Sequence, residues 1–351
     1  MNKENKIFNV FESHIKAIDE EIKRTLSDQD DLLMYDMMRY FFGYLDENLK
    51  KINDYGGKHF RSSLCLYLAE SYGKKEDLIE VAAAIELFHN FTLIHDDIED
   101  HDEIRRGKPT IWKKFGQEQA INTGDAQLIL SNLEICKACE GVRGLDLSVA
   151  GYMNKVFLKV SEGQFLDMKM AELPLYHDFV NEENYLDMIK RKSAILVSAS
   201  SGVVGIALGL PDKETRALSE YGQNLGLAYQ IWDDIISIWG KEEDTGKKEA
   251  KDIYEKKKTL PILSLYERAS NDEKRKLENI YNSPKIARKA DLDYIYSLLN
   301  TYNIKAMTKQ KVFSYIEKSN NAVKSLSISQ GNKEFLLDVN RNLFPSIEEV
   351  K

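Results

Sequence analysis

The chain has 351 residues, 43% of them hydrophobic, and a formal net charge of −8 at pH 7. That length allows a substantial core, and the acidic balance argues against binding nucleic acid through a basic surface. Three cysteines (Cys65, Cys136 and Cys139) form no disulfide framework, so we expect a cytoplasmic protein. Six prolines, nineteen glycines and the lack of sustained alternation predict long helices rather than a sheet, and no linker divides residues 1–351 into separate domains.

Residues 1–50 read as two amphipathic helices, and the first chemical signal follows them at Gly56-Gly57-Lys58 and Arg61. Paired glycines before a helix let the backbone approach an anion closely, and Lys58 and Arg61 add positive charge there. A Gly-Gly turn leading into a helix is common, so this signal is weak by itself. His89 lies two helical turns before the next motif, where a lone histidine is more often a core residue.

An apolar helical run, Val81 to Ile94, ends in the acidic string Asp96-Asp97-Ile98-Glu99-Asp100. At 3.6 residues per turn, Asp96 and Asp100 lie one above the other on one helix face, where like charges repel. The arrangement makes sense if divalent cations bind there, and oxygen-only ligands suit Mg²⁺, which bridges to substrate phosphates. Arg105 and Arg106 supply forked donors for phosphate oxygens. Gly107 and Pro109 predict a loop around them.

The uncharged stretch from Ser193 to Pro211 barely reaches the ~20 residues of a membrane span and is rich in small residues. We therefore expect a buried central helix and no transmembrane segment. A second apolar helix then ends in Asp233-Asp234, followed by the cations Lys256–Lys258. Such a run is by default a solvated face, but directly after a second acidic cluster in an acidic protein it favours a phosphate contact. Antiparallel packing would bring both acidic clusters to the mouth of one apolar pocket, which suits a metal, a diphosphate and a hydrocarbon.

These residues resemble the trans-isoprenyl diphosphate synthases, or polyprenyl synthetases, from about Gly56 to Pro261. Each motif alone is weak, but seven in the family's order make chance similarity very improbable. They are DDxxD at Asp96 to Asp100, RRG at Arg105 to Gly107, GQxxD at Gly163 to Asp167, the lysine-threonine-alanine element at Lys192 to Ala194, the second aspartate pair at Asp233-Asp234, TGK at Thr245 to Lys247, and KxTLP at Lys257 to Pro261.

The resemblance implies an all-α, isoprenoid-synthase-type helical bundle around a central cavity, normally a homodimer. Three Mg²⁺ would bridge Asp96, Asp100 and Asp233 to an allylic diphosphate, in a catalytic set of Asp96, Asp97, Asp100, Arg105, Lys192, Gln230, Asp233, Asp234, Lys247 and Lys257. Isopentenyl diphosphate, the second substrate, would bind at Gly57, Lys58, Arg61, His89 and Arg106. The activity implied is condensation of the two into a short all-trans prenyl diphosphate.

Three departures from the family pattern stand out. His59 and Ser62 replace an arginine and a proline of GGKRxRP, so we expect a weaker isopentenyl site. Ser237 replaces the last aspartate of the second motif. Trp112 replaces a histidine common after RRGxPT, and the sequence offers no reason for it.

Product length should depend on the helix below the first motif. Phe91 lies five residues before Asp96, or about 7.5 Å deeper at 1.5 Å per residue, and Phe88 adds a second ring on that face. Either both are core packing or Phe91 is a floor that stops chain growth. The string from His89 to Asp97 looks like that of archaeal-type geranylgeranyl diphosphate synthases, which favours a C20 product; a floor at Phe88 would shorten it to C15.

Two alternatives remain within the resemblance. A terpene cyclase on the same fold would keep Asp96, Asp100 and Asp233. It would have no use for Lys58, Arg61, His89 and Arg106 together. A non-catalytic subunit that modulates another synthase would be expected to lose acidic residues. The retained motifs favour condensation over both.

Overall fold

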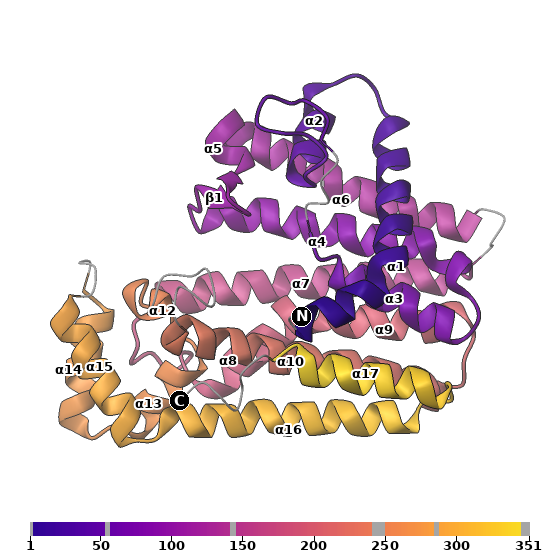
Figure 1. Cartoon of the computed structure of the whole chain (residues 1–351). Helices are drawn as coiled ribbons and strands as arrows, with labels where there is room; N and C mark the ends of the chain where they lie inside the picture. The colour runs from indigo at the N-terminus through magenta and orange to yellow at the C-terminus, as the bar shows by residue number, and fades with distance from the viewer. Residues whose placement is uncertain (1–2, 53–56, 141–144, 241–249, 284–287, 345–351) are drawn as a thin grey trace. The chain divides into compact units, whose positions relative to one another are not determined.

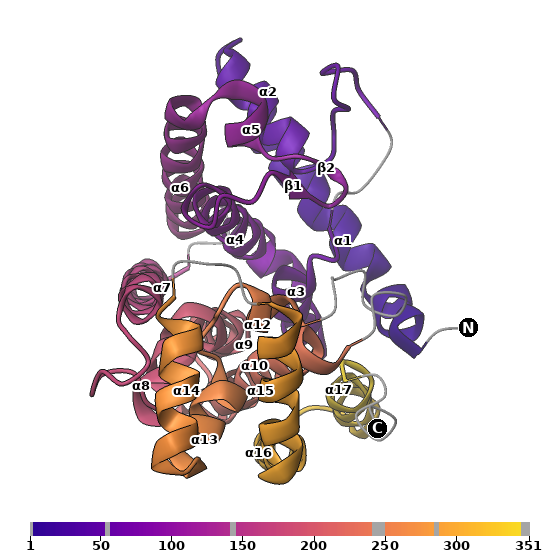
Figure 2. The same ribbon diagram turned by 90° about the vertical axis from the view of Figure 1, so that its left-hand side faces the viewer.

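The computed structural model describes residues 3–52, 57–140, 145–240, 250–283 and 288–344. Within these ranges helices form nearly all of the regular structure, which confirms the all-α prediction (Figure 1, Figure 2). The chain forms two compact units, which are described separately below. Unit 1 comprises Met1–Phe157 with Ser200–Thr215, and unit 2 comprises Leu158–Ala199 with Arg216–Lys351.

Unit 1 is built around α4, which packs along α6 and also contacts α1 and α3. Every residue of α4 from Glu80 to Phe88 is buried, as expected of a helix enclosed by neighbours. The elements of this unit are α1 (Lys3–Ser27), α2 (Leu33–Phe41), α3 (Phe60–Ser71), the 3₁₀ turn η1 (Lys75–Leu78), α4 (Ile79–Glu99), β1 (Ile104–Arg105), β2 (Lys108–Pro109), α5 (Ile111–Phe115), α6 (Gln117–Glu140) and the first part of α7 (Ser148–Glu172).

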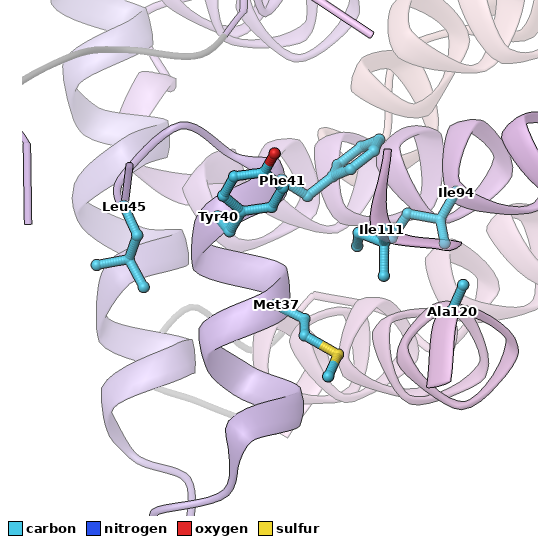
Figure 3. Packing of buried hydrophobic residues seen from close by; sticks show 7 residues of the cluster. All are labelled: Met37, Tyr40, Phe41, Leu45, Ile94, Ile111 and Ala120. Carbon is cyan, nitrogen blue, oxygen red and sulfur yellow. The ribbon is translucent and has the colours of Figure 1, made fainter. Parts of the chain in front are cut away.

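A hydrophobic cluster holds the end of α4 that carries the acidic motif. Its members come from α2, α4, α5, α6 and the chain after α2, and Figure 3 shows them as sticks: Met37, Tyr40, Phe41, Leu45, Ile94, Ile111 and Ala120. Trp112 and Phe115 pack against the cluster from its edge. The last turn of α4 is therefore fixed by packing, although Asp96 is partly exposed and Glu99 is exposed.

The segment after α4 is a tight hairpin rather than the loop that the sequence predicted. Strands β1 and β2 pair antiparallel, with Arg105 opposite Lys108. The two residues between them, Arg106 (φ 53°) and Gly107 (φ 75°), both lie in the left-handed region. A two-residue turn of this kind requires positive φ at both positions, and glycine adopts it at no steric cost. The RRG motif is thus a turn that sets the directions of its two arginines.

Unit 2 consists of the remaining helices, several with identifiable start signals. Ser270 and Glu273 form a capping box at α14, and the side chains of Asn181 and Ser329 accept from the backbone of Asn184 and Asn332 at the starts of α8 and α17. The elements are the rest of α7, α8 (Glu182–Ile189), the π-helical turn η2 (Lys190–Ala194), the first turn of α9 (Ile195–Ala207), α10 (Asp212–Trp239) from Arg216 onward, α12 (Lys251–Tyr254), α13 (Leu260–Arg268), α14 (Asn271–Tyr281), α15 (Lys289–Thr301), α16 (Ile304–Ser325) and α17 (Gln330–Asn342). The rest of α9 and the start of α10 belong to unit 1.

The uncharged stretch from Ser193 onward is helical and nearly all buried as far as Gly205, as expected. Among the described residues, one helical stretch, Lys75–Glu99, has the length and composition to cross a membrane. Since 67% of its most apolar window is buried inside the structure, it fits the central helix of a folded core.

Candidate active site

The first acidic motif lies at the C-terminal end of α4. Asp96 is partly exposed, Asp100 is exposed, and the amide of Asp100 donates to the carbonyl of Asp96 at 2.8 Å. Their spacing within this helical turn places both on one face, as predicted. Carboxylates at a helix C-terminus oppose the helix dipole, which favours cations there. Binding of divalent cations would offset both the repulsion and the dipole.

Asp97, between them in sequence, takes a different role. It is 1% exposed, and Arg105 donates from Nε to its Oδ1 at 2.7 Å. Burial raises the pKa of the Asp97 carboxyl to about 6, against the opposing effect of the Arg105 guanidinium. The structure therefore joins Asp97 to the hairpin, where it positions Arg105.

The rest of the hairpin is held by a second set of contacts. Thr110 Oγ1 and Trp112 Nε1 both donate to the carbonyl of Asp102, at 2.9 and 2.8 Å. Trp112 also packs edge-on against His101. The tryptophan that the sequence left unexplained thus ties α5 to the segment between the acidic motif and β1.

The predicted isopentenyl-site residues form two contacts within unit 1. Arg61 Nη1 lies 3.1 Å from His89 Nε2. The guanidinium of Arg106 lies near Gly57, where a Cβ would be 3.5 Å from its Nη2. Burial lowers the pKa of His89 well below its usual value, and the charge of Arg61 adds to the effect. Two guanidinium groups beside a neutral imidazole suit an anion, and exposed Lys58 adjoins them in sequence.

His59 replaces a family arginine without facing the solvent. Its side chain is 2% exposed, with Nδ1 3.3 Å from Glu86 Oε1 and Nε2 3.7 Å from Asp19 Oδ1. Burial alone would lower the pKa of His59, but Glu86 and Asp19 outweigh it and raise it. Buried Ser62 donates to Glu86 at 2.7 Å. His59 and Ser62 therefore link α1, α3 and α4 through buried contacts, close in sequence to Lys58 and Arg61.

The second acidic pair lies in unit 2 near the end of α10. Asp233 is partly exposed, whereas Asp234 is 3% exposed. The hydroxyl of Tyr185 donates to Asp234 Oδ2 at 2.5 Å, and the amide of Leu260 donates to the same oxygen at 3.4 Å. Burial raises the pKa of Asp234 well above its usual value. Ser237, one turn later, is also buried, so an acid there would carry a desolvation cost that serine avoids.

Lys192 lies on the π-helical turn η2, between two close approaches of neighbouring helices. A Cβ on Gly163 of α7 would lie 2.2 Å from the backbone nitrogen of Lys192, and one on Gly226 of α10 would lie 2.7 Å from Cα of Ala194. Only glycine tolerates these distances. Insertions of this kind in α-helices are frequent at functional sites.

Two hydrogen bonds organise the polar groups on this turn. Lys192 Nζ bonds Asp167 Oδ2 at 2.6 Å, and Ser193 Oγ donates to Gln230 Oε1 at 2.8 Å. The glycine and the aspartate of GQxxD thus act together: Gly163 admits the turn and Asp167 holds its lysine. Gln230 lies on α10 three residues before Asp233, so the structure gathers Lys192 and Gln230 in one unit with the second acidic pair.

The three lysines after α12 differ in their partners. Lys256 Nζ donates to the carbonyl of Ser283, and Lys258 Nζ donates to the carbonyls of Met170 and Ala171. Lys257 is exposed and its Nζ lies 3.4 Å from Glu255 Oε2. Lys257 is therefore the member of the tract best placed to meet a ligand. The predicted site residue Lys247, with the rest of its TGK motif, lies outside the described residues.

The two predicted floor residues are placed differently. Phe88 is 1% exposed and stacks on Phe157, with ring centroids 3.7 Å apart. Phe91 is partly exposed and contacts Phe88 at 5.5 Å between centroids. Phe88 is thus a core residue that supports Phe91, and Phe91 keeps a face that a ligand could meet.

The carboxylate oxygens of Asp96, Asp100 and Asp233 fit Mg²⁺ in chemistry and in exposure. Among the described residues no group of three or more His, Cys, Asp or Glu side chains comes together as a metal centre. The convergence of the two acidic motifs, which belong to different units, stays a prediction.

Some supporting residues were not found from the sequence. Tyr185 carries no motif signal, and Asp19 lies in an ordinary amphipathic helix. Asp167 belongs to the GQxxD motif, and its spacing of four residues from Gly163 could have indicated a shared helix face.

Comparison with known proteins identifies the family. The family model described as polyprenyl synthetase matches residues 43–299. Geranylgeranyl diphosphate synthase of Sulfolobus acidocaldarius is 33% identical over 303 residues, 76% of this chain and 90% of that protein. That of Saccharolobus solfataricus is 37% identical over 264 residues, 71% of this chain and 77% of that protein.

Solved structures agree with the sequence relatives. The crystal structure of geranylgeranyl pyrophosphate synthetase from Pyrococcus horikoshii superposes with a TM-score of 0.85 at 29% identity, covering 98% of this chain and 99% of that one. The family match alone spans both acidic motifs and the residues around them. The chain belongs to the polyprenyl synthetase family.

Proposed function

We propose that this protein is a Mg²⁺-dependent prenyltransferase that condenses isopentenyl diphosphate with dimethylallyl, geranyl or farnesyl diphosphate. The favoured product is the C20 geranylgeranyl diphosphate. The observation that carries the proposal is a pair of contacts in unit 1, where Arg61 lies against His89 and Arg106 lies against Gly57, which would suit a second diphosphate. An enzyme that only ionises an allylic diphosphate needs one diphosphate site; an enzyme that condenses two diphosphates needs two.

The described residues suggest how the reaction proceeds. Asp96, Asp100 and Asp233 would hold three Mg²⁺, which when bound supply positive charge to the diphosphate that leaves. Lys192 and Arg105, fixed by Asp167 and Asp97, would bind the same group. Their charges are preorganised for the negative charge that develops on the leaving oxygen.

The bond changes balance without a further reactant. The allylic carbon–oxygen bond breaks, the double bond of isopentenyl diphosphate attacks the resulting carbocation, and a new carbon–carbon bond forms. A proton is then lost to the departed diphosphate. Arg61 and Arg106 would hold the isopentenyl diphosphate during this step, with His89 neutral beside them.

Product length rests on Phe91. Relatives at similar identity include geranylgeranyl diphosphate synthases and the (2E,6E)-farnesyl diphosphate synthase of Mycobacterium bovis, 34% identical over 241 residues, 68% of this chain and 65% of that protein. The partly exposed ring of Phe91 is the group that would meet the end of the chain. We expect Phe91→Ala to lengthen the products; an unchanged product pattern would refute the floor assignment.

We propose that the two units form one functional domain and that two copies of the chain form a homodimer. The family match runs through both units, which supports one functional domain. On α6 the apolar side chains of Ile121, Ile129 and Leu133 are 40%, 57% and 54% exposed along one side of the helix. A stripe of this kind suits a second copy of the chain. Leu133→Lys should then lower the mass measured by light scattering.

Three free cysteines, one of them buried, accord with a cytoplasmic enzyme. The buried cysteine is Cys65, and the other two, Cys136 and Cys139, lie on α6.

One assay tests the proposal against its alternatives. The purified protein is incubated with Mg²⁺, isopentenyl diphosphate and farnesyl diphosphate, and the products are sized by chromatography. Geranylgeranyl diphosphate supports the synthase. Cyclic hydrocarbons would indicate a terpene cyclase, and unreacted substrates would indicate a non-catalytic subunit that modulates another synthase.

A further inference from the structure

A row of aromatic rings runs along α4 towards the first acidic motif. Phe88, Phe91 and His95 occupy positions i, i+3 and i+7, which share one helix face. The centroid of Phe91 lies 5.5 Å from that of Phe88 and 4.8 Å from that of His95. Phe157 of α7 stacks on Phe88 at 3.7 Å and closes the deep end of the row. The Phe91 ring therefore lies between two aromatic neighbours on the same helix.

At the other end of the row, the His95 ring packs against a position of α6 that has no side chain. His95 packs against Gly124 of α6, where a Cβ would lie 2.3 Å from Nε2 and 2.5 Å from Cδ2 of the imidazole. Those distances are far shorter than a van der Waals contact. The imidazole of His95 can therefore occupy this position only because residue 124 has no side chain. Nε2 also lies 3.6 Å from Oδ1 of Asp125, the next residue of α6.

We propose that Gly124 is a positioning residue for product length, which acts through His95 on the ring of Phe91. A methyl group at position 124 would push the imidazole towards Phe91, and that ring, backed by Phe88, would move into the space that holds the end of the growing chain. Gly124 itself lies on another helix and touches no substrate. The inference rests on the proposed function, and specifically on Phe91 as the floor of the pocket.

The first test compares two glycine-to-alanine variants. Gly124→Ala and Gly151→Ala both replace a helical glycine with a better helix former, but an added Cβ at Gly151 meets no atom within 4 Å. With geranyl diphosphate as primer, Gly124→Ala should raise the ratio of C15 to C20 product by about tenfold, at the low end of what one methylene discriminates in an apolar pocket. Gly151→Ala should leave the ratio unchanged.

The second test asks whether His95 transmits the effect. His95→Ala should by itself shift the products towards greater length, because Phe91 loses the ring behind it. In the His95→Ala background, Gly124→Ala should have no further effect, since the added methyl meets no imidazole. Thermal unfolding of all four variants, measured alongside, identifies loss of fold. The measured quantity is a product ratio, so a lower rate caused by changes near Asp96 does not affect the conclusion.

The inference is overturned if Gly124→Ala leaves the ratio unchanged or lengthens the products. It is also overturned if Gly124→Ala shifts the ratio equally with and without His95. These outcomes differ from a failure of the proposed function, in which the unmodified protein would make no prenyl diphosphate at all.

Discussion

The two aspartate pairs look alike in sequence but are supported differently. In unit 1, Asp97 is buried and accepts a charged hydrogen bond from Arg105. In unit 2, Asp234 is equally buried but accepts from two neutral donors, the Tyr185 hydroxyl and the Leu260 amide. In both pairs the preceding aspartate stays partly exposed.

The difference shows how each region holds the cation that we propose binds phosphate. In unit 1 the cation itself, Arg105, is the partner of the buried acid, and the RRG turn aims it. In unit 2 the cation Lys192 is placed by backbone packing at Gly163 and then bonded to Asp167. One region uses a buried ion pair and the other uses close helix contacts, so they should fail under different substitutions.

The largest effect is expected from Gly163→Ala, which breaks the unit 2 arrangement. The added Cβ would lie 2.2 Å from the Lys192 backbone nitrogen, and backbone cannot give way as a side chain can. Displacement of η2 by about 1 Å should lower kcat/KM by about 100-fold. Steady-state kinetics with farnesyl and isopentenyl diphosphate measure it. Gly151→Ala is the matched control on the same helix, and equal activity in both variants would show that the close approach does not position Lys192.

The next effect tests the ion pair of unit 1. Asp97→Asn keeps the shape of the side chain but leaves Arg105 without a carboxylate. Hydrogen bonds between charged groups contribute about 1.5–3 kcal/mol, so kcat/KM should fall by about 10- to 100-fold. If the variant retains full activity, then Asp97 does not hold Arg105 in its working position.

Much of this arrangement was predictable from the sequence, and the rest depended on contacts between distant residues. The spacing of Asp96 and Asp100 placed them on one helix face, and the apolar run before them predicted a buried helix. The partner of Asp234, by contrast, lies 49 residues away at Tyr185, where no local pattern marks it. The hairpin at Arg106 was missed because an arginine at positive φ is stabilised by its surroundings rather than by its own preference.

A smaller effect is expected from Asp234→Asn, the counterpart of the change at Asp97. An amide oxygen can accept from the Tyr185 hydroxyl and the Leu260 amide much as a carboxylate does. The free-energy cost of the substitution should therefore not exceed that of one neutral hydrogen bond, about 0.5–1.5 kcal/mol. We expect kcat/KM to fall by less than about tenfold. Kinetics of the two asparagine variants side by side test the comparison directly: a larger loss at Asp234 than at Asp97 would reverse it.

A buried acid outside both motifs should affect stability rather than catalysis, and it shows what burial does away from the candidate site. Glu134 of α6 accepts from Thr25 Oγ1 at 2.6 Å, and burial raises the pKa of its carboxyl to about 7 from the usual 4.5. The folded state then holds the proton more tightly than the unfolded state. The protonated Glu134 carboxyl therefore contributes its full stabilisation below pH 4.5, and this contribution is lost as the pH rises through 7. Because Glu134→Gln cannot ionise, its free energy of unfolding relative to the unmodified protein should rise by on the order of 3 kcal/mol between pH 4.5 and pH 7. Denaturant unfolding at several pH values measures this gain, with Glu118→Gln at an exposed position of α6 as the control; parallel pH profiles for the Glu134→Gln variant and the unmodified protein would contradict the raised pKa.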